Sequence, residues 1–199
     1  MDVVQHLPLA RQIAEYIDVT MLGRLALEHD NALIMACFAA VDGDHLEIGT
    51  MHGGSAILVA MLKRELGLSG NVTCIDPLDG YYAGTRYACP ADPLTHVPVT
   101  IETIRENERR FGVKLDVIQA KSIPFPVAGR RFATAYIDGD HWGIAPVMDF
   151  INCMMVTERY IIFDNCSAPH PDVMRACEAA EAAWRPVLRQ GITCVVEHL

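Results

Sequence analysis

The sequence predicts a doubly wound α/β fold, in which a mostly parallel sheet carries helices on both faces and follows a helical cap. Three observations predict it. Five short apolar runs alternate with helix-like segments along most of the 199 residues, a glycine-rich turn follows the first run, and each run is followed by polar residues. Strands that alternate with helices pair in parallel through right-handed crossovers, which leaves both faces of the sheet covered.

The elements follow one another in a regular order. Residues 8–40 are apolar at helical spacing and predict two or three helices, expected as a cap (1–40) before an α/β core at 44–199. The tail after Trp184 fits one strand or a hairpin turning at Gln190 and Gly191, and the hairpin is favoured. The predicted strands are 44–49, 72–76, 115–119, 132–138 and 160–164, and the predicted helices between and after them are 54–66, 100–111, 143–157 and 171–183. This order is Rossmann-like.

Composition is that of a packed globular chain, since 51% of the residues are hydrophobic and 21% are charged. One domain over residues 1–199 is expected. The net charge of -9 disfavours nucleic acid as a partner, because phosphate backbones are bound by clustered cations. No apolar stretch reaches the roughly 18 residues of a membrane span, so a soluble, cytoplasmic protein with a small-molecule partner and no membrane partner is expected. Exposed apolar N-terminal helices would also suit a homo-oligomer.

The seven cysteines include no Cys-x-x-Cys pair. Their spacing therefore indicates neither a zinc knuckle nor a thioredoxin-like site, and they are expected to be reduced. They are Cys37, Cys74, Cys89, Cys153, Cys166, Cys177 and Cys194.

Polar residues fall at the ends of all five predicted core strands. In a doubly wound sheet, ligands bind beyond the carboxyl ends of the strands, so these residues are expected to share one site. They are the glycine-rich turn after the first strand, Asp76, Ser122, Asp138, and the pair Asp164 and Asn165.

The glycine-rich turn has the spacing Glu47-x-Gly49-x-x-x-Gly53. Glycines let the backbone turn tightly and approach a ligand, and the helix that follows points its amide groups at a carboxylate. The Gly-x-Gly-x-x-Gly pattern of dinucleotide folds is not present. A plain turn between strand and helix is the alternative.

Asp76 ends the second predicted strand. An acidic residue at this place can accept both hydrogen bonds of a ribose diol, as it does in enzymes that use nicotinamide or adenosylmethionine. The alternative role of Asp76 is to cap the turn at Pro77.

These segments together resemble the class I S-adenosylmethionine-dependent methyltransferases. More narrowly, they resemble the metal-dependent O-methyltransferases, both the catechol type and the antibiotic-biosynthesis group that methylates sugar hydroxyls. The resemblance runs from about residue 44 to 166 and rests on residues 46–56, 74–76, 121–122, 136–141 and 163–165. It implies S-adenosylmethionine as the cofactor, bound by Glu47, Gly49, Thr50, Met51, Gly53, Ser55, Asp76, Pro77, Ser122 and Asp138.

Three oxygen-bearing residues at adjacent strand ends indicate a cation site. Asp138, Asp164 and Asn165 supply the hard oxygen ligands that suit Mg²⁺. By resemblance they also match the family's metal-binding aspartate and its Asp-Asn pair. Capping of the next turn by Asp164 and Asn165 is the alternative.

His141 lies three residues after Asp138 and is expected to act as the catalytic general base. An imidazole takes up a proton near neutral pH, and a metal ion lowers the pKa of a hydroxyl that it binds. The catechol type has lysine at the corresponding place, whereas the sugar-methylating group has histidine. A structural role as a cap of the following helix is the alternative.

The connection from Asp79 to Val99 is longer than an inert loop usually is, and predicts a substrate lid or a mobile segment. Tyr81, Tyr82 and Tyr87 could face an apolar acceptor. An insertion without a role is the alternative, and the sequence does not decide what Asp140 does.

The function expected from these residues is Mg²⁺-dependent transfer of a methyl group from S-adenosylmethionine to a hydroxyl of a small molecule such as a natural product, sugar or phenol. A nicotinamide-dependent oxidoreductase is the first alternative. A non-catalytic S-adenosylmethionine-binding protein is the second.

Overall fold

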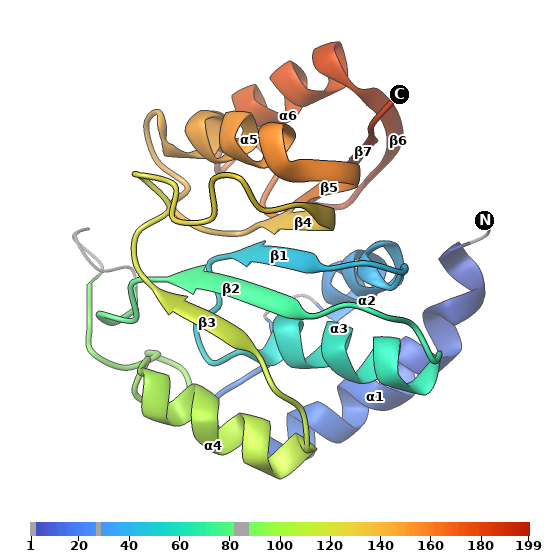
Figure 1. The fold of residues 1–199 in the computed structure, drawn as a ribbon. Coiled ribbons are helices and arrows are strands. Elements are labelled where there is room, and N and C mark those ends of the chain that lie inside the picture. Colours follow the sequence, from blue (N-terminus) through green and yellow to red (C-terminus); the bar gives the residue numbers. More distant parts are fainter. Residues whose placement is uncertain (1–2, 27–28, 82–87) are drawn as a thin grey trace.

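Seven strands form one mixed sheet (Figure 1). The computed structural model describes residues 3–26, 29–81 and 88–199. The strands are β1 (His45–Ile48), β2 (Val72–Asp76), β3 (Asp116–Gln119), β4 (Phe132–Ile137), β5 (Thr157–Phe163), β6 (Arg185–Gln190) and β7 (Thr193–Glu197). Their order in the sheet is β3-β2-β1-β4-β5-β7-β6. The first five are parallel, and β7 runs antiparallel to both β5 and β6. The predicted parallel core and C-terminal hairpin are both confirmed.

The fifth strand begins earlier than its predicted start at residue 160. α5 (Ala145–Val156) passes into β5 at Thr157 without a loop, and Thr157 pairs with Phe132 of β4. Glu158 and Arg159 make this stretch polar, so the apolar pattern shows only from Tyr160 onward.

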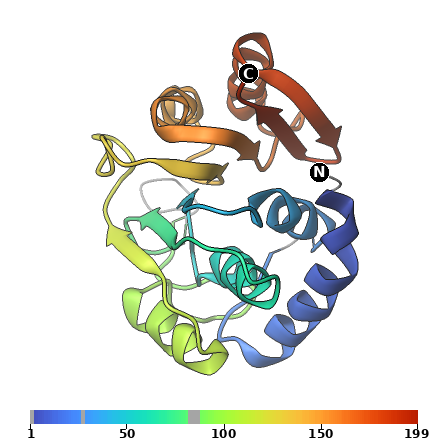
Figure 2. The ribbon, with the colours of Figure 1, turned by 45° about the vertical axis from the view of Figure 1, so that its right-hand side comes forward.

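Helices cover both faces of the sheet (Figures 1 and 2). One layer contains α1 (Leu7–Thr20), α2 (His29–Ala39), α3 (Gly54–Glu65) and α4 (Ile101–Phe111), and the other contains α5 and α6 (Pro171–Ala183). The sheet has a separate apolar core on each face: Tyr136 and Ile162 point into the first layer, while Ile137 and Phe163 point into the second. Among the described helices, none is both long and apolar enough to cross a membrane.

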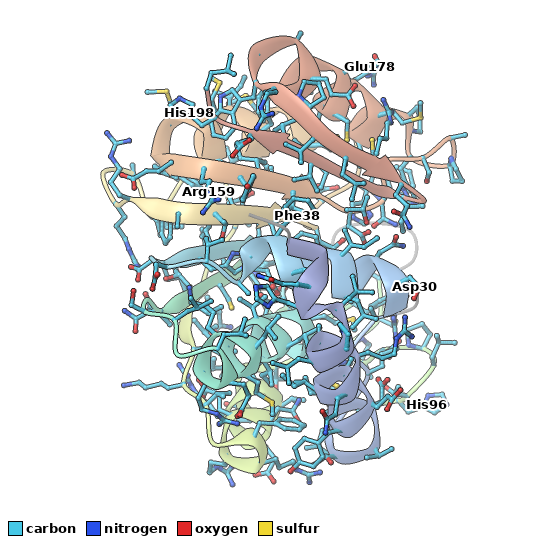
Figure 3. The ribbon with its side chains drawn as sticks, turned by 90° about the vertical axis from the view of Figure 1, so that its right-hand side faces the viewer. Asp30, Phe38, His96, Arg159, Glu178 and His198 are labelled. Carbon is cyan, nitrogen blue, oxygen red and sulfur yellow. The ribbon has the colours of Figure 1, made fainter. Side chains whose placement is uncertain are left out.

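The two N-terminal helices, which follow a short 3-10 turn at Val3–His6, belong mainly to the first helical layer. α1 packs on α2 and α3, and α2 packs on β4 and β5. Phe38 of α2 lies at the sheet (Figure 3), with its ring edge-on to Tyr160 at a centroid distance of 5.3 Å. Residues from the segment that joins these helices and from the first turn of α2 reach the edge of the sheet formed by the carboxyl ends of its parallel strands: Arg24, Leu25, Ala26, Asn31 and Ala32.

Candidate functional site

A cavity of about 400 Å³ opens at the carboxyl ends of β1, β2, β4 and β5. It is the place where ligands bind in doubly wound sheets. Two of the predicted cofactor residues, Glu47 and Gly53, do not line this cavity. The predicted site residues that do line it are Gly49, Thr50, Met51, Ser55, Asp76, Pro77, Ser122, Asp138, His141, Asp164 and Asn165.

The turn after β1 needs glycine for steric reasons. Gly49 has φ +82°, and a Cβ there would overlap the backbone carbonyl oxygen of Asp138. Gly53 has φ +83° and lies directly before α3. A Cβ on Gly54 would come within 2.7 Å of Leu25 Cα. The glycines therefore let the turn lie against the end of β4 and let the N-terminal segment reach the start of α3.

Glu47 supports the turn from below instead of facing the cavity. Its buried Oε1 accepts hydrogen bonds from Thr50 Oγ1 at 3.1 Å and from Ser55 Oγ at 2.8 Å. Burial raises the pKa of Glu47 to about 8, helped by the charges of Asp138 and Asp76, against these two hydrogen bonds. The Glu47 side chain therefore links β1 to α3 by a hydrogen bond, and its carboxyl group can carry a proton near neutral pH.

Asp76 joins the end of β2 to the glycine-rich turn. Its Oδ2 accepts from the backbone amides of Thr50 at 2.7 Å and Met51 at 3.0 Å. Its Oδ1 accepts from Leu78 N at 2.8 Å, which is the turn cap that the sequence left open as an alternative. The carboxylate also lines the cavity, so capping and ligand binding by Asp76 are compatible.

Four side chains meet at the ends of β4 and β5. His141 Nε2 lies 3.2 Å from Asp138 Oδ1. The Asn165 amide group, with its nitrogen turned toward the cluster, donates to Asp138 Oδ1 at 3.3 Å, His141 Nε2 at 3.2 Å and Asp164 Oδ2 at 3.3 Å. The opposite amide orientation directs the Asn165 oxygen at the same acceptors. The structure therefore brings together all three residues predicted to bind a metal and the predicted base.

Negative charge dominates this cluster. Burial lowers the pKa of His141, but the hydrogen bond with Asp138 and the charges of Asp138, Asp164 and Asp140 outweigh it, so the pKa is raised overall. The neighbouring Tyr136 has its pKa raised by burial and by Asp138 and Asp164. His141 is buried, with a relative exposure of 6%. Its ring lies edge-on to the ring of His170, with the two ring centroids 5.0 Å apart. The electrostatic field at this point favours a bound cation.

Asp140 and Ser122 have local partners that the sequence did not indicate. Asp140 Oδ1 accepts from Trp142 N at 3.0 Å, which shapes the turn that carries His141. Ser122 lies beside Asp149 of α5, a buried carboxyl group whose pKa is raised to about 6 by burial, while Ser122 opposes the shift. Both Asp140 and Ser122 still line the cavity.

The described parts of the 79–99 connection pack against the N-terminal segment. Tyr81 N donates to Cys89 O at 2.7 Å, and Cys89 N donates to Tyr81 O at 3.1 Å. Arg24 Nε donates to the buried Asp92 at 2.9 Å, and its guanidinium lies 6.0 Å from the centre of the Tyr81 ring. Tyr82 and Tyr87, which were predicted to face an acceptor, lie outside the described residues.

Several cavity residues come from the N-terminal segment and were not predicted individually. The only sequence signal was the apolar helical spacing of residues 8–40, which indicated a cap without saying which side chains reach the ligand. Lys121, Tyr136 and Ile192 were also missed as lining residues. The N-terminal lining residues are Arg24, Leu25, Ala26, Asn31 and Ala32.

Solved structures resemble this chain over nearly its whole length. The O-methyltransferase NovP is 16% identical, with a TM-score of 0.70 over 99% of this chain and 99% of that one. The O-methyltransferase TomG from Streptomyces achromogenes, involved in tomaymycin synthesis and solved with S-adenosylmethionine, is 14% identical, with a TM-score of 0.56 over 100% of this chain and 91% of that one. An O-methyltransferase from Bacillus cereus, solved with S-adenosylhomocysteine, is 17% identical, with a TM-score of 0.54 over 97% and 90%.

The sequence itself matches no family model and no curated protein. The structural likeness shows that the chain has the Rossmann-like fold of the class I methyltransferases, as the resemblance in its motifs predicted.

Proposed function

We propose that this protein is an S-adenosylmethionine-dependent O-methyltransferase that uses a divalent cation, Mg²⁺, and acts on a hydroxyl of a small molecule. The observation that carries the proposal is the meeting of Asp138, Asp164, Asn165 and His141 in one cavity beside the glycine-rich turn. The O-methyltransferase structures that share the fold support it. A nicotinamide oxidoreductase is disfavoured because the glycine spacing is not that of dinucleotide folds.

The glycine-rich turn and Asp76 would hold the cofactor. The missing Cβ at Gly49 lets the turn lie against Asp138 at the edge of the cavity, and the amides at the start of α3 favour a carboxylate such as that of a methionine moiety. Asp76 faces the cavity at the end of β2, where a ribose diol is bound in related folds. Ser122 lines the side of the cavity beyond β3, which suits an adenine ring.

The cation would be held by Asp138, Asp164 and Asn165. Two carboxylates and one amide oxygen form a hard donor set, and they lie close enough together to share one small ion. A bound Mg²⁺ would supply a positive charge that lowers the pKa of a hydroxyl in contact with it. The same residues disfavour zinc as the resident metal, since no thiolate faces this cavity among the described residues.

His141 is the group placed to take the proton of the acceptor. The reaction forms a bond between the acceptor oxygen and the methyl carbon, breaks the bond between that carbon and the sulfonium sulfur, and leaves a thioether and a proton. His141 lines the cavity beside Asp138, so the neutral imidazole with no proton on Nε2 would accept this proton there, and the Asp138 carboxylate would then accept a hydrogen bond from the imidazolium. The turn of Asp140 and Trp142 holds the imidazole in place.

A methyl-transfer screen tests the proposal. Purified protein, labelled S-adenosylmethionine and a panel of hydroxylated sugars, phenols and natural products are combined with Mg²⁺ or with EDTA. We expect labelled product from some acceptors, lost with EDTA and restored by Mg²⁺. Equilibrium dialysis against S-adenosylmethionine and NAD accompanies the screen. Binding of NAD without binding of S-adenosylmethionine would overturn the proposal, and turnover indifferent to EDTA would remove the cation from it.

A further inference from the structure

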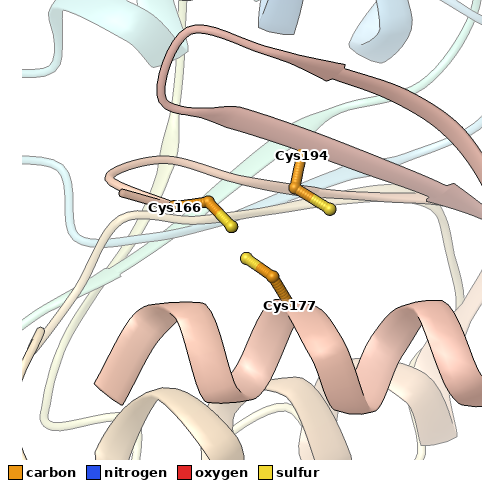
Figure 4. A group of neighbouring side chains, drawn as sticks. All are labelled: Cys166, Cys177 and Cys194. Atoms are coloured by element: carbon orange, nitrogen blue, oxygen red, sulfur yellow. The ribbon is translucent and has the colours of Figure 1, made fainter. Parts of the chain in front are cut away.

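Three cysteines that are separated in the sequence meet in the apolar core between α6 and the sheet (Figure 4). Cys166 follows the end of β5, Cys177 lies in α6, and Cys194 lies in β7. Their Sγ atoms all lie within 4.8 Å of one another, and the three side chains are buried. Among the described residues, no other group of cysteine, histidine and acidic side chains is this close.

The backbone holds this cluster in place. Cys166 N donates to Ile192 O at 2.7 Å, which ties the loop after β5 to the turn of the β6–β7 hairpin. β7 then pairs directly with β5, with Cys194 opposite Phe163. Figure 4 shows Cys177 reaching from α6 toward the two other thiols. The cluster thus joins α6 on one side to the loop after β5 and to β7 on the other.

We propose that Cys166, Cys177 and Cys194 bind one thiophilic cation, Zn²⁺, as a three-thiolate site. Thiolates are the ligands that select zinc over magnesium. A Zn–S distance of about 2.3 Å places tetrahedral ligands about 3.8 Å apart, which is compatible with three Sγ atoms that all lie within 4.8 Å of one another. Each thiol would release its proton on binding, since the thiolate is the ligand.

Arg189 and Glu181 complete the surroundings of the cluster. Arg189 Nη2 lies 3.4 Å from Cys166 Sγ, and Arg189 Nη1 donates to Glu181 Oε2 at 3.1 Å. Glu181 Oε1 accepts from Cys194 Sγ at 3.7 Å and offers an oxygen ligand for a fourth position. A dication with three thiolates and the Glu181 carboxylate carries two net negative charges, one of which the guanidinium of Arg189 offsets.

The site would fasten the loop that follows β5. Cys166 is the next residue after Asp164 and Asn165, so a metal that holds Cys166 to α6 and β7 fixes the base of the proposed magnesium site. Such a site stabilises the folded chain because the ligands are brought together only by folding. Its metal binding is independent of methyl transfer, so each proposal can fail without the other.

Cadmium absorption tests the site on the whole protein. The chain is purified with reductant and chelator, freed of both, and titrated with Cd²⁺ while the ultraviolet charge-transfer band of thiolate-bound cadmium is followed. We expect the band to saturate at one ion per chain, to disappear when Zn²⁺ displaces Cd²⁺, and the melting temperature to rise with either ion. Binding at the oxygen cluster, formed by Asp138, Asp164 and Asn165, gives no such band because these residues supply no thiolate.

Two alanine variants, one at a proposed ligand and one at a control cysteine, test which thiols bind the metal. Cys177→Ala is expected to weaken cadmium binding more than about 100-fold, since even loss of a residue outside the ligand shell costs up to that factor. Cys153→Ala, at an equally buried cysteine of α5, is expected to leave the band unchanged. A wild-type protein without the band at micromolar Cd²⁺ would overturn the proposal, as would a thiol count showing that two of the seven cysteines pair in a disulfide.

Discussion

Asp164, Asn165 and Cys166 are consecutive, yet they face two regions of opposite chemistry. Asp164 and Asn165 meet Asp138 at the open edge of the sheet, where the proposed metal ligands are oxygens. Cys166 meets two other thiols in the buried layer between α6 and the sheet. Hard oxygens favour magnesium and soft sulfurs favour zinc, so one short segment is expected to separate two metals by ligand type alone.

The two regions also differ in exposure. The oxygen cluster opens into a cavity of about 400 Å³, where a substrate can enter. The cysteine cluster has side chains that are 5% exposed or less, so a substrate cannot reach it. The first arrangement suits catalysis and the second suits a structural role, because catalytic metal sites keep an open position.

The largest effect is expected from removing a ligand of the oxygen cluster. Asp164→Ala should lower kcat by about 1000-fold, because a cation that stabilises charge in the transition state contributes several kcal/mol. Steady-state methyl transfer with saturating Mg²⁺ measures this loss. The cadmium band of the same variant should stay at wild-type intensity, since the thiols are untouched. The matched control is Asp116→Asn, at the start of β3, where the carboxylate pairs with Arg130 and lies away from the cavity. Equal losses in the two variants would contradict the assignment.

The next effect is on stability and concerns the turn that supports the oxygen cluster. Gly49→Ala should lower the free energy of unfolding by about 3 kcal/mol or more, because the residue has φ +82° and its Cβ would overlap Asp138. Gly67→Ala, at φ +67° with open space around it, should cost only about 1 kcal/mol. Denaturant unfolding compares the two. Similar costs would show that the close approach of the turn to β4 is not needed.

The base should matter less than the cation. His141→Ala is expected to lower kcat by about 100-fold, the lower end of the range for general acid–base catalysis. Binding of S-adenosylmethionine, followed by calorimetry, should stay near the wild-type value because no hydrogen bond from His141 to the glycine-rich turn is found among the described residues. Full turnover in this variant would leave His141 with a structural role at the cluster.

Much of the oxygen edge could be predicted from the sequence because parallel strands bring their carboxyl ends together. Asp138, Asp164 and Asn165 each follow an apolar run, so a rule about sheets was enough to place them side by side. The residue pair Arg24 and Asp92 could not be found in this way, since nothing local links them.

The cysteine cluster could not be predicted from the sequence either, because nothing local links its three members. Its three members have no motif spacing, and they meet only because α6 crosses over the β5–β7 pair. The spacing rule that argued against a zinc knuckle was sound, but it tests only for ligands that are close in sequence. The early start of β5 at Thr157 was missed because the charged residues Glu158 and Arg159 interrupt the apolar pattern of the strand.

The last effect is a dependence of stability on pH and concerns Glu47, a buried carboxyl group beneath the glycine-rich turn. Its pKa of about 8 is higher than the ordinary 4.5, so the folded state binds more protons between these values. The stability of the wild-type protein should therefore fall as pH rises from about 5 through about 8, while Glu47→Gln carries no such loss. We expect the variant to gain up to about 4 kcal/mol over the wild type between about pH 5 and about pH 9, measured by urea unfolding. Glu65→Gln, at an exposed site on α3, should show no gain with pH. A gain in both variants would trace the effect to overall charge. A gain in Glu47→Gln alone would assign it to the buried carboxyl group beside Asp138 and Asp76.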